Sequence, residues 1–249
     1  MIPPLSVVMV DKSQHKTRIA VVGAMGYVGK GICGALRNDE SIKITEVTRK
    51  NYAEKREHEY NIVINAAMPS KRFWARQHPI QDFDETVKKT SEIFYTWNYK
   101  KFIQISTVSS RCQLDTIYGR HKAAAETICS SPDTLIVRLG PMYSEGLEKG
   151  VLIDMLQGNT VFAHGDSRYC FVSLEFVSNW ICSNLCRVGL VEVGGRNAIA
   201  LKDVAQYLGQ AINFQGALDH QEIEQPVSGF PEAGMVRKYL DSMLKRQEI

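Results

Sequence analysis

The sequence predicts an α/β protein built on a doubly wound parallel sheet. Short apolar runs alternate along the chain with segments of helical composition, and a glycine-rich turn directly follows the first apolar run. The length of 249 residues suits one core with a small appended lobe. Parallel strands need crossover helices, and right-handed crossovers place those helices on both faces of the sheet.

The alternation begins with a β-α-β unit between Arg18 and Lys50. An apolar strand over residues 18–22 leads into the glycine turn, and a helix runs to about Arg37. Further strands are expected at 42–47, 61–67, 102–106 and 134–139, and helices at 84–97 and 118–129. This order of elements predicts a Rossmann-like fold.

The pattern loosens beyond Tyr143. Short strands are expected near 160–162 and 169–172, and helices near 174–186, 201–212 and 235–245. We therefore predict a single Rossmann-like domain over residues 18–249, in which residues from about 144 onward contribute a small substrate lobe. Residues 1–17 are an N-terminal extension to which the sequence assigns no role.

Composition and charge exclude several functional classes. The 30 basic and 27 acidic residues give a net charge of +3 and form no dense basic run, which argues against nucleic-acid binding. The longest apolar stretches are far shorter than the roughly 20 residues of a membrane-spanning helix. The N-terminus lacks a secretory leader, and the six cysteines form no C-x-x-C or Cys/His cluster. We expect a cytoplasmic protein with reduced thiols and no metal.

The glycine turn reads Gly23-Ala-Met-Gly26-Tyr-Val-Gly29 and lies between a strand and a helix. Glycines permit a tight turn and let the backbone approach a pyrophosphate, which the N-terminus of the following helix attracts. A turn that uses glycine only for packing is the alternative. The position between strand and helix favours a dinucleotide site.

The end of the second strand reads Val47-Thr48-Arg49-Lys50. Cofactors without a 2′-phosphate usually meet a carboxylate at this point, whereas a guanidinium suits the 2′-phosphate. We therefore expect NADP rather than NAD, with Thr48 and Arg49 as contacts. A solvated basic strand end is the alternative.

Tyr118 and Lys122 stand four residues apart, so a helix places them on one face. A free tyrosine has a pKa near 10, and a neighbouring cation favours its phenolate form. This spacing also arises by chance. Here, however, it follows the strand at 102–106 and a hydroxyl-rich segment, Ser106-Thr-Val-Ser-Ser110.

The G-x-x-G-x-x-G spacing and the Tyr/Lys pair after a hydroxyl-rich strand end resemble the extended and atypical short-chain dehydrogenases/reductases. The resemblance implies that Tyr118 exchanges a proton with a substrate oxygen while hydride moves to or from the nicotinamide. Thr107 would hydrogen-bond that oxygen, with Ser106 or Ser109 as rivals. Lys122 would lower the pKa of Tyr118 and hold the nicotinamide ribose.

The same resemblance extends the site to further segments. Asn65-Ala66-Ala67 resembles the segment behind the adenosine and ribose, and 139–143 resembles the turn that meets the carboxamide. The expected cofactor contacts are Gly23, Met25, Gly26, Tyr27, Val28, Gly29, Thr48, Arg49, Asn65, Ala66, Ala67, Lys122, Pro141 and Met142. The expected substrate contacts are Ser109, Tyr143 and Arg168.

The segments 165–172 and 193–203 resemble C-terminal segments of enzymes that act on nucleotide sugars. Arg168 would bind the diphosphate, and an ordinary surface arginine is the alternative. Three features depart from the family pattern. The stretch between the second and third strands is short, the helical asparagine of the proton relay is not evident around 84–90, and the C-terminal lobe is small.

The first functional hypothesis is an NADP-dependent reductase of a carbonyl on a nucleotide-linked sugar or a similar small metabolite. An NAD-dependent nucleotide-sugar epimerase or dehydratase is the enzymatic alternative. A non-catalytic NADP-binding regulatory protein is the alternative of another class, because a fold does not imply a function. The resemblance also implies a homodimer formed through the helices near 84–97 and 118–129.

Overall fold

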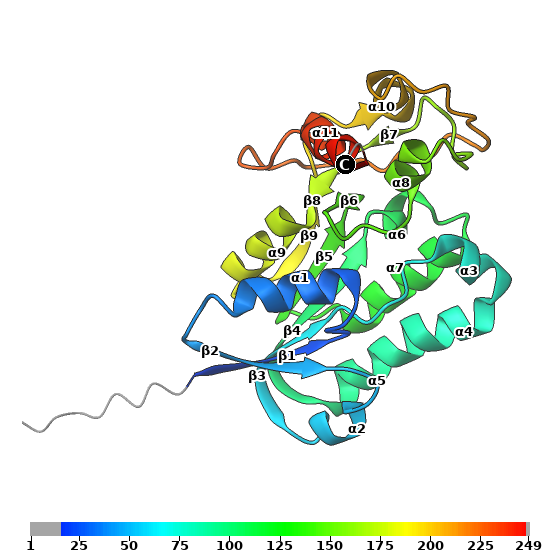
Figure 1. Cartoon of the computed structure of the whole chain (residues 1–249). Helices are drawn as coiled ribbons and strands as arrows, with labels where there is room; N and C mark the ends of the chain where they lie inside the picture. Colours follow the sequence, from blue (N-terminus) through cyan, green and yellow to red (C-terminus); the bar gives the residue numbers. More distant parts are fainter. Residues whose placement is uncertain (1–15, 248–249) are drawn as a thin grey trace, which may run out of the picture.

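The computed structural model describes residues 16–247 (Figure 1). Its centre is a six-stranded sheet in the order β2-β1-β3-β4-β5-β9, in which every neighbouring pair is parallel. The strands are β1 (Thr17–Val22), β2 (Ile42–Val47), β3 (Glu59–Asn65), β4 (Asn98–Thr107), β5 (Thr134–Leu139) and β9 (Gly189–Val193). The Rossmann-like α/β fold predicted from the sequence is confirmed.

The strand order reverses direction at β1, which lies between β2 and β3. The chain crosses to one side of β1 after the glycine turn and returns to the other side after β2. The carboxyl ends of β1 and β3 therefore meet, with Val22 paired to Asn65. Ligands of open α/β sheets bind at such a point. The connection between β2 and β3 holds only the short helix α2 (Tyr52–Lys55).

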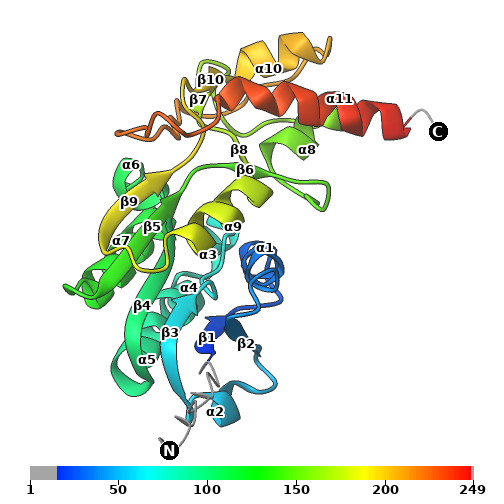
Figure 2. The ribbon, with the colours of Figure 1, turned by 90° about the vertical axis from the view of Figure 1, so that its left-hand side faces the viewer.

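Helices cover both faces of the sheet (Figure 2). On one face α1 (Tyr27–Leu36) packs beside α9 (Leu174–Ser183), and their apolar side chains share a core with the strands. On the other face α5 (Lys89–Thr96) packs beside α7 (Ile117–Cys129), where Ile93 and Cys129 are fully buried. The short helix α6 (Ser109–Cys112) connects β4 to α7.

The prediction of a single regular helix over residues 84–97 is wrong in two ways, its starting residue and its uninterrupted α-helical geometry. The helical region begins earlier, with α3 (Arg72–Gln77) and α4 (Pro79–Phe83), and continues as a π-helical turn over Asp84–Lys88 before α5. Pro79 occupies the first turn of α4, where proline is tolerated because its missing N–H would have no partner. Single π turns are frequent at functional sites.

The C-terminal part forms a lobe over the carboxyl ends of the strands (Figure 1). It has an apolar core of its own, to which Leu152, Phe171 and Leu240 contribute fully buried side chains. Its elements are β6 (Met142–Tyr143), α8 (Val151–Leu156), β7 (Arg168–Tyr169), β8 (Val172–Ser173), β10 (Ile199–Ala200), α10 (Leu201–Tyr207), a 3-10 turn (Ala233–Met235) and α11 (Val236–Gln247).

Several element boundaries differ from those expected. The strand expected at 61–67 covers 59–65, and the helix expected at 201–212 ends at Tyr207. β9 was not predicted. Residues 1–15 of the expected extension lie outside the described residues, and Thr17 already belongs to β1. Among residues 16–247, no helix is long and apolar enough to cross a membrane.

Candidate active site

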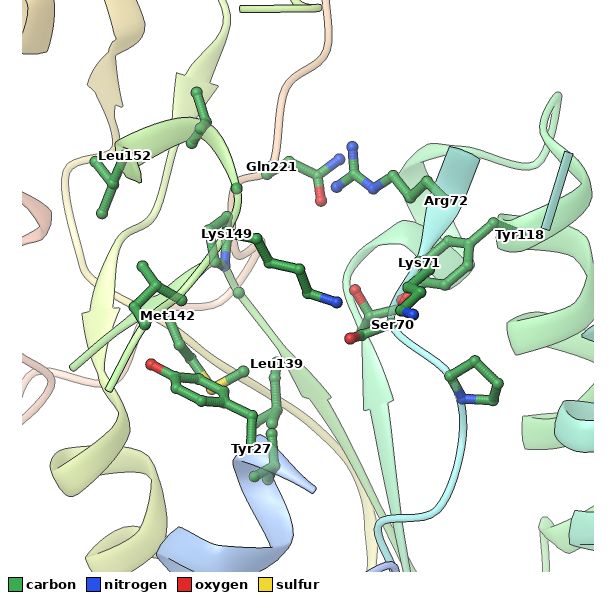
Figure 3. Close-up of a pocket in the computed structure, with 18 of the residues that line it drawn as sticks. Tyr27, Ser70, Lys71, Arg72, Tyr118, Leu139, Met142, Lys149, Leu152 and Gln221 are labelled. Atoms are coloured by element: carbon green, nitrogen blue, oxygen red, sulfur yellow. The ribbon is translucent and has the colours of Figure 1, made fainter. Parts of the chain in front are cut away.

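A cavity of about 890 Å³ opens between the carboxyl ends of the strands and the C-terminal lobe (Figure 3). The sheet side contributes the first residues of α1, the segment after β3, and the ends of β4 and β5. The lobe contributes residues 146–152 and 161–163. The cavity therefore lies at the reversal of strand order, where the fold predicts a ligand.

The glycine turn has the backbone geometry that a close approach to a ligand requires. Gly23 has a φ of +84°, and a side chain there would place Cβ 2.7 Å from the carbonyl oxygen of Ala66. A Cβ on Gly29 would lie 2.2 Å from the carbonyl oxygen of Gly23. Both positions therefore demand glycine, because the helix packs directly on the turn and the turn on the segment after β3.

The N-terminus of α1 faces the same region without a side-chain cap. Gly26 is the N-cap residue and offers no side-chain hydrogen bond, so the first backbone N–H groups of this ten-residue helix remain available as donors. Tyr27 and Val28 line the cavity. Together with the glycine turn, this arrangement fits the pyrophosphate of a dinucleotide.

The basic end of β2 lies apart from the cavity. The Arg49 side chain is 93% exposed, and its Nη2 atom is 3.9 Å from a carboxylate oxygen of Glu85. Thr48 donates hydrogen bonds from its N–H and its hydroxyl to Oδ1 of Asn51, at 2.8 and 3.2 Å. Thr48 is thereby fixed, whereas the Arg49 guanidinium stands in solvent within ion-pair distance of Glu85.

Asn65 organises the backbone after β3 from a fully buried position. Its side-chain amide donates to Thr90 Oγ1 at 3.2 Å and to Gln104 Oε1 at 3.0 Å, and its oxygen accepts the Ala67 N–H at 3.2 Å. The side chain is thus engaged within the protein, and Ala66 lines the cavity next to it.

Tyr118 and Lys122 project from α7 into the cavity, where they are 7% and 3% exposed. The Lys122 Nζ atom donates to the carbonyl oxygen of Pro69 at 2.7 Å and lies 5.0 Å from the centroid of the Tyr118 ring. Burial raises the pKa of Tyr118 to about 12, although the Arg72 guanidinium and the Thr107 hydroxyl oppose the rise. Burial lowers the pKa of Lys122 to about 7.

The two pKa shifts bear on the expectation that Lys122 lowers the pKa of Tyr118. The cation whose field lowers the pKa of Tyr118 in this structure is Arg72. The expected lowering by Lys122 stays a prediction. With its pKa above the ordinary value, Tyr118 is a protonated phenol at neutral pH.

The hydroxyl groups at the end of β4 and in the residues after it divide into two sets. Ser106 and Ser110 both donate to Oε1 of Glu126 at 2.5 Å, so their hydroxyls are committed to that carboxylate. Thr107 lines the cavity, and its hydroxyl lies 3.4 Å from Ser109 Oγ. The Ser106 hydroxyl is therefore bound to a buried carboxylate, whereas the Thr107 hydroxyl makes only the longer contacts with Ser109, at 3.3 and 3.4 Å.

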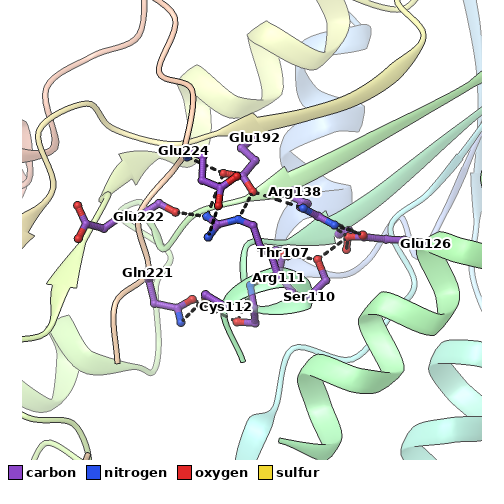
Figure 4. A network of polar contacts seen from close by, with 12 residues as sticks. Thr107, Ser110, Arg111, Cys112, Glu126, Arg138, Glu192, Gln221, Glu222 and Glu224 are labelled. Atoms are coloured by element: carbon purple, nitrogen blue, oxygen red, sulfur yellow. Dashed lines mark hydrogen bonds and ion pairs between the residues drawn. The ribbon is translucent and has the colours of Figure 1, made fainter. Parts of the chain in front are cut away.

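A buried charge network supports this segment from behind (Figure 4). Glu126 on α7 accepts from Arg138 Nη2 at 2.7 Å, and Glu192 on β9 accepts from Arg111 Nε at 2.8 Å. Burial raises the pKa of Glu192, but hydrogen bonds from Arg111 and from the Glu224 backbone outweigh it and hold this pKa below its ordinary value. The network ties α6, α7, β5 and β9 together around the hydroxyl-rich segment.

Arg72 is a cavity residue that sequence reasoning missed. Its Nη1 donates to Asp219 Oδ2 at 2.7 Å and its Nη2 to Ser109 Oγ at 3.3 Å. Asp219 also accepts from the Tyr169 hydroxyl at 2.9 Å and from Gln221 Nε2 at 2.6 Å. Figure 3 shows Arg72 extending toward Gln221 above Tyr118. The sequence did offer one signal for Arg72. The residue follows closely after β3, a strand that was expected to end at the ligand site.

The three residues expected to contact the substrate are not among those that line the cavity. The Arg168 side chain is 47% exposed, pairs with Glu222 at 3.4 Å and does not line the cavity. Tyr143 packs its ring 5.1 Å from that of Tyr239, within the lobe. Ser109 lies behind the cavity wall and donates to Gln221 Oε1 at 3.2 Å.

Of the remaining expected cofactor contacts, Pro141 and Met142 line the cavity near Tyr27. Met25 is 61% exposed at the glycine turn. Pro141 and Met142 follow the end of β5, which the cavity reaches, whereas Met25 does not line the cavity.

No protein-family model and no curated protein matches the sequence. Solved structures match over most of the chain. A dTDP-4-dehydrorhamnose reductase from Clostridium acetobutylicum has a TM-score of 0.72 at 14% identity, covering 92% of this chain and 100% of that one. The same enzyme from Bacillus anthracis, in complex with NADP, has a TM-score of 0.73 at 16% identity, covering 91% and 98%.

The structure of a UDP-glucose 4-epimerase from Thermotoga maritima with UDP-glucose also matches over most of the chain. Its TM-score is 0.67 at 15% identity, covering 92% of this chain and 100% of that one. Reductases and epimerases therefore match with nearly equal scores. The chain has the Rossmann-like fold of these proteins, which is the fold expected from its resemblance to the extended short-chain dehydrogenases/reductases.

Proposed function

We propose that the chain is an NADP-dependent oxidoreductase that reduces a carbonyl group of a nucleotide-linked sugar or a similar small metabolite. The observation that carries the proposal is the convergence of Tyr118, Lys122 and Thr107 on one cavity beside the glycine turn. A proton donor, a cation and a hydroxyl group at the switch point of the sheet are the groups that carbonyl reduction needs.

The residues around the glycine turn would hold the dinucleotide. The α1 N-terminus would bind the pyrophosphate, Arg49 the 2′-phosphate, and the segment Pro141–Met142 the nicotinamide side. When bound, the cofactor supplies the hydride. Lys122 would hold the ribose hydroxyls, for which its ammonium must turn away from Pro69.

The chain's own residues supply the proton and the orientation. The Thr107 hydroxyl donates a hydrogen bond that fixes the substrate carbonyl oxygen, and the Tyr118 phenol donates its proton to that oxygen. Reduction requires Tyr118 in its protonated form, and the raised pKa of Tyr118 keeps the phenol protonated at neutral pH. The direction of net turnover follows from the supply of reduced cofactor.

The charge of the cavity supports an anionic substrate. Four cationic side chains line it and only two acidic ones do, so phosphate groups are attracted there. The cationic residues are Lys71, Arg72, Lys122 and Lys149, and the acidic ones are Glu148 and Asp154. Figure 3 shows Lys149 pointing from the lobe toward Ser70 and Lys71. A nucleotide-linked sugar combines such phosphates with a reducible carbonyl.

Turnover of purified protein tests the proposal. We expect consumption of NADPH with dTDP-4-dehydrorhamnose or a related nucleotide-linked ketosugar, and tighter binding of NADPH than of NADH in a fluorescence titration. Protein that retains NAD and interconverts UDP-glucose without net consumption of cofactor would support an epimerase instead. Tighter binding of NADH would contradict the role of Arg49.

The substitution Tyr118→Phe tests the mechanism. It removes the proton donor and leaves the ring, so turnover should fall by about a hundredfold or more while NADPH binding persists. Tyr207→Phe is the matched control, because its hydroxyl bonds only Asp241 on the lobe surface. Full activity of Tyr118→Phe would refute the proton-donor role.

A further inference from the structure

Arg72 presents a guanidinium to the cavity that its contacts within the protein occupy only in part. The residue lies on α3 and lines the cavity, and its side chain is 40% exposed. Its Nη1 atom donates to Asp219 Oδ2 at 2.7 Å, and its Nη2 atom donates to Ser109 Oγ at 3.3 Å. An arginine has five N–H donors in a planar fork, so these two contacts leave donors for a ligand.

The ion pair with Asp219 does not by itself account for an arginine at this position. Both carboxylate oxygens of Asp219 also accept hydrogen bonds from neutral donors, namely Tyr169 at 2.9 Å, Gln221 at 2.6 Å and Gln113 at 2.8 Å. The hydrogen-bonding capacity of the carboxylate is thus largely met without Arg72. Asp219 holds one edge of the guanidinium, and the side chain remains exposed to the cavity.

The guanidinium also lies close to the hydroxyl that we expect to bind the substrate carbonyl oxygen. Ser109 Oγ, which accepts from Arg72 Nη2, is 3.4 Å from Thr107 Oγ1. The Nη2 atom is therefore within about 7 Å of the Thr107 hydroxyl. Hydrogen bonds of about 2.9 Å at each end would take up most of this span. A molecule that meets both groups must carry an anionic oxygen very near its carbonyl oxygen.

The diphosphate of a nucleotide-linked sugar does not meet this requirement. It is attached to the anomeric carbon, and ring atoms separate it from a ring carbonyl. A separate cation, Lys149, extends from the lobe toward Ser70 and Lys71 and would serve the diphosphate (Figure 3). A carboxylate on the carbon next to the carbonyl carbon does meet the requirement. Its two oxygens also match the parallel N–H donors of a guanidinium.

We propose that Arg72 is a specificity-determining residue that binds a substrate carboxylate attached next to the reacting carbonyl, as in the 4-keto form of a hexuronic acid. This inference deepens the proposed function and rests on it, because it takes the Tyr118 and Thr107 hydroxyls as the groups that bind the carbonyl oxygen. A sugar with a hydroxymethyl group in place of the carboxylate leaves the guanidinium without an anionic partner. Such a sugar is therefore bound less tightly.

Equilibrium binding of two nucleotide sugars tests the inference. UDP-glucuronic acid and UDP-glucose differ only at C6, which is a carboxylate in the first and a hydroxymethyl group in the second. Both carry an alcohol where the substrate has its carbonyl, so neither is reduced when NADPH is present. We expect the wild type with NADPH to bind UDP-glucuronic acid about tenfold more tightly or better in isothermal titration calorimetry.

Substitutions of Arg72 should change this preference. Arg72→Met removes the charge, so the two dissociation constants should become nearly equal. Arg72→Lys keeps the charge without the planar fork and should retain part of the preference. Arg18→Met is the matched control, because Arg18 pairs with Glu59 at 3.3 Å at the amino end of β1, away from the cavity, and this variant should keep the full preference.

The ratio of the two dissociation constants separates recognition from a structural role. Loss of the contact between α3 and the lobe would weaken both ligands alike and leave their ratio unchanged. A preference that survives in Arg72→Met would therefore overturn the inference. If that variant does not fold, the wild-type preference and its reduction in Arg72→Lys decide, and an unreduced preference in Arg72→Lys would overturn the fork as its source.

The wild type separates this inference from the proposed function. A protein that reduces a nucleotide-linked ketosugar with NADPH but binds the two probes equally would overturn the inference and leave the proposed function intact. Binding of neither probe, together with no turnover of any nucleotide-linked ketosugar, would overturn both.

Discussion

Replacing Lys122 by methionine should stabilise the protein while abolishing its turnover. The lysine is 3% exposed and contacts Pro69 through one hydrogen bond. Burial lowers its pKa from 10.5 to about 7, which means that the folded state disfavours the charged form. Methionine fills a similar volume without a charge, so the variant escapes this penalty.

The pKa shift sets both the size and the sign of the effect. Each pKa unit corresponds to about 1.4 kcal/mol, so the penalty is about 5 kcal/mol well below pH 7, where Lys122 is protonated in both states. It is about 4 kcal/mol at pH 7 and vanishes above the unfolded pKa of 10.5. The unfolded state binds more protons in between, so this group makes the protein more stable as pH rises.

Urea unfolding of both proteins without nucleotide measures the effect. The lost hydrogen bond to Pro69 costs about 1 kcal/mol, so Lys122→Met should gain about 3 kcal/mol of unfolding free energy at about pH 7. The gain should shrink to nearly zero at about pH 10. A variant less stable than the wild type at neutral pH would refute the reasoning. So would a gain that does not change with pH.

Two further substitutions test the glycine turn and the charge network. Gly29→Ala would place a methyl group 2.2 Å from a backbone oxygen of Gly23, so NADPH affinity should fall about tenfold or more in a fluorescence titration, with a loss of about 1–3 kcal/mol of stability. Gly34→Ala, on the same helix with open space around it, is the control that should keep both. Glu126→Gln removes a buried charge that an arginine and two serines contact, and should cost about 3 kcal/mol in urea unfolding. The exposed Glu175→Gln should cost almost nothing, and equal losses in the two variants would contradict a supporting role for the network.

The strand ends that frame the cavity were predictable because local signals and tertiary structure agree there. β2 and β5 have the predicted bounds: β2 mixes isoleucine and valine with polar residues and is followed by a turn, and β5 is mostly apolar and is followed by a Gly-Pro pair. The helix carrying Tyr118 begins one residue earlier than predicted, at Ile117, after the N-cap Thr116. These elements place the glycine turn and the Tyr118/Lys122 pair relative to each other.

Elements stabilised mainly by distant partners were not predictable. β9 joins the sheet by pairing with β5, although its first two residues are exposed and its five residues carry no distinctive periodicity. The region before Asp84 mixes apolar and charged residues without a clear helical period and contains Pro79, yet it packs against α7 as helices. Local sequence carries no signal for such packing.

The substrate side of the cavity shows the same limit more sharply. Arg72 and Asp219 are 147 residues apart, and neither belongs to a motif. Their pairing depends on the lobe bringing the 219–221 segment back to the carboxyl end of β4. Gln221 then accepts from Ser109, whose hydroxyl also meets Thr107 and Arg72. The Thr107 hydroxyl, which we expect to orient the carbonyl, therefore contacts a serine that the lobe holds through Gln221, so its position depends on the lobe as well as on the sheet.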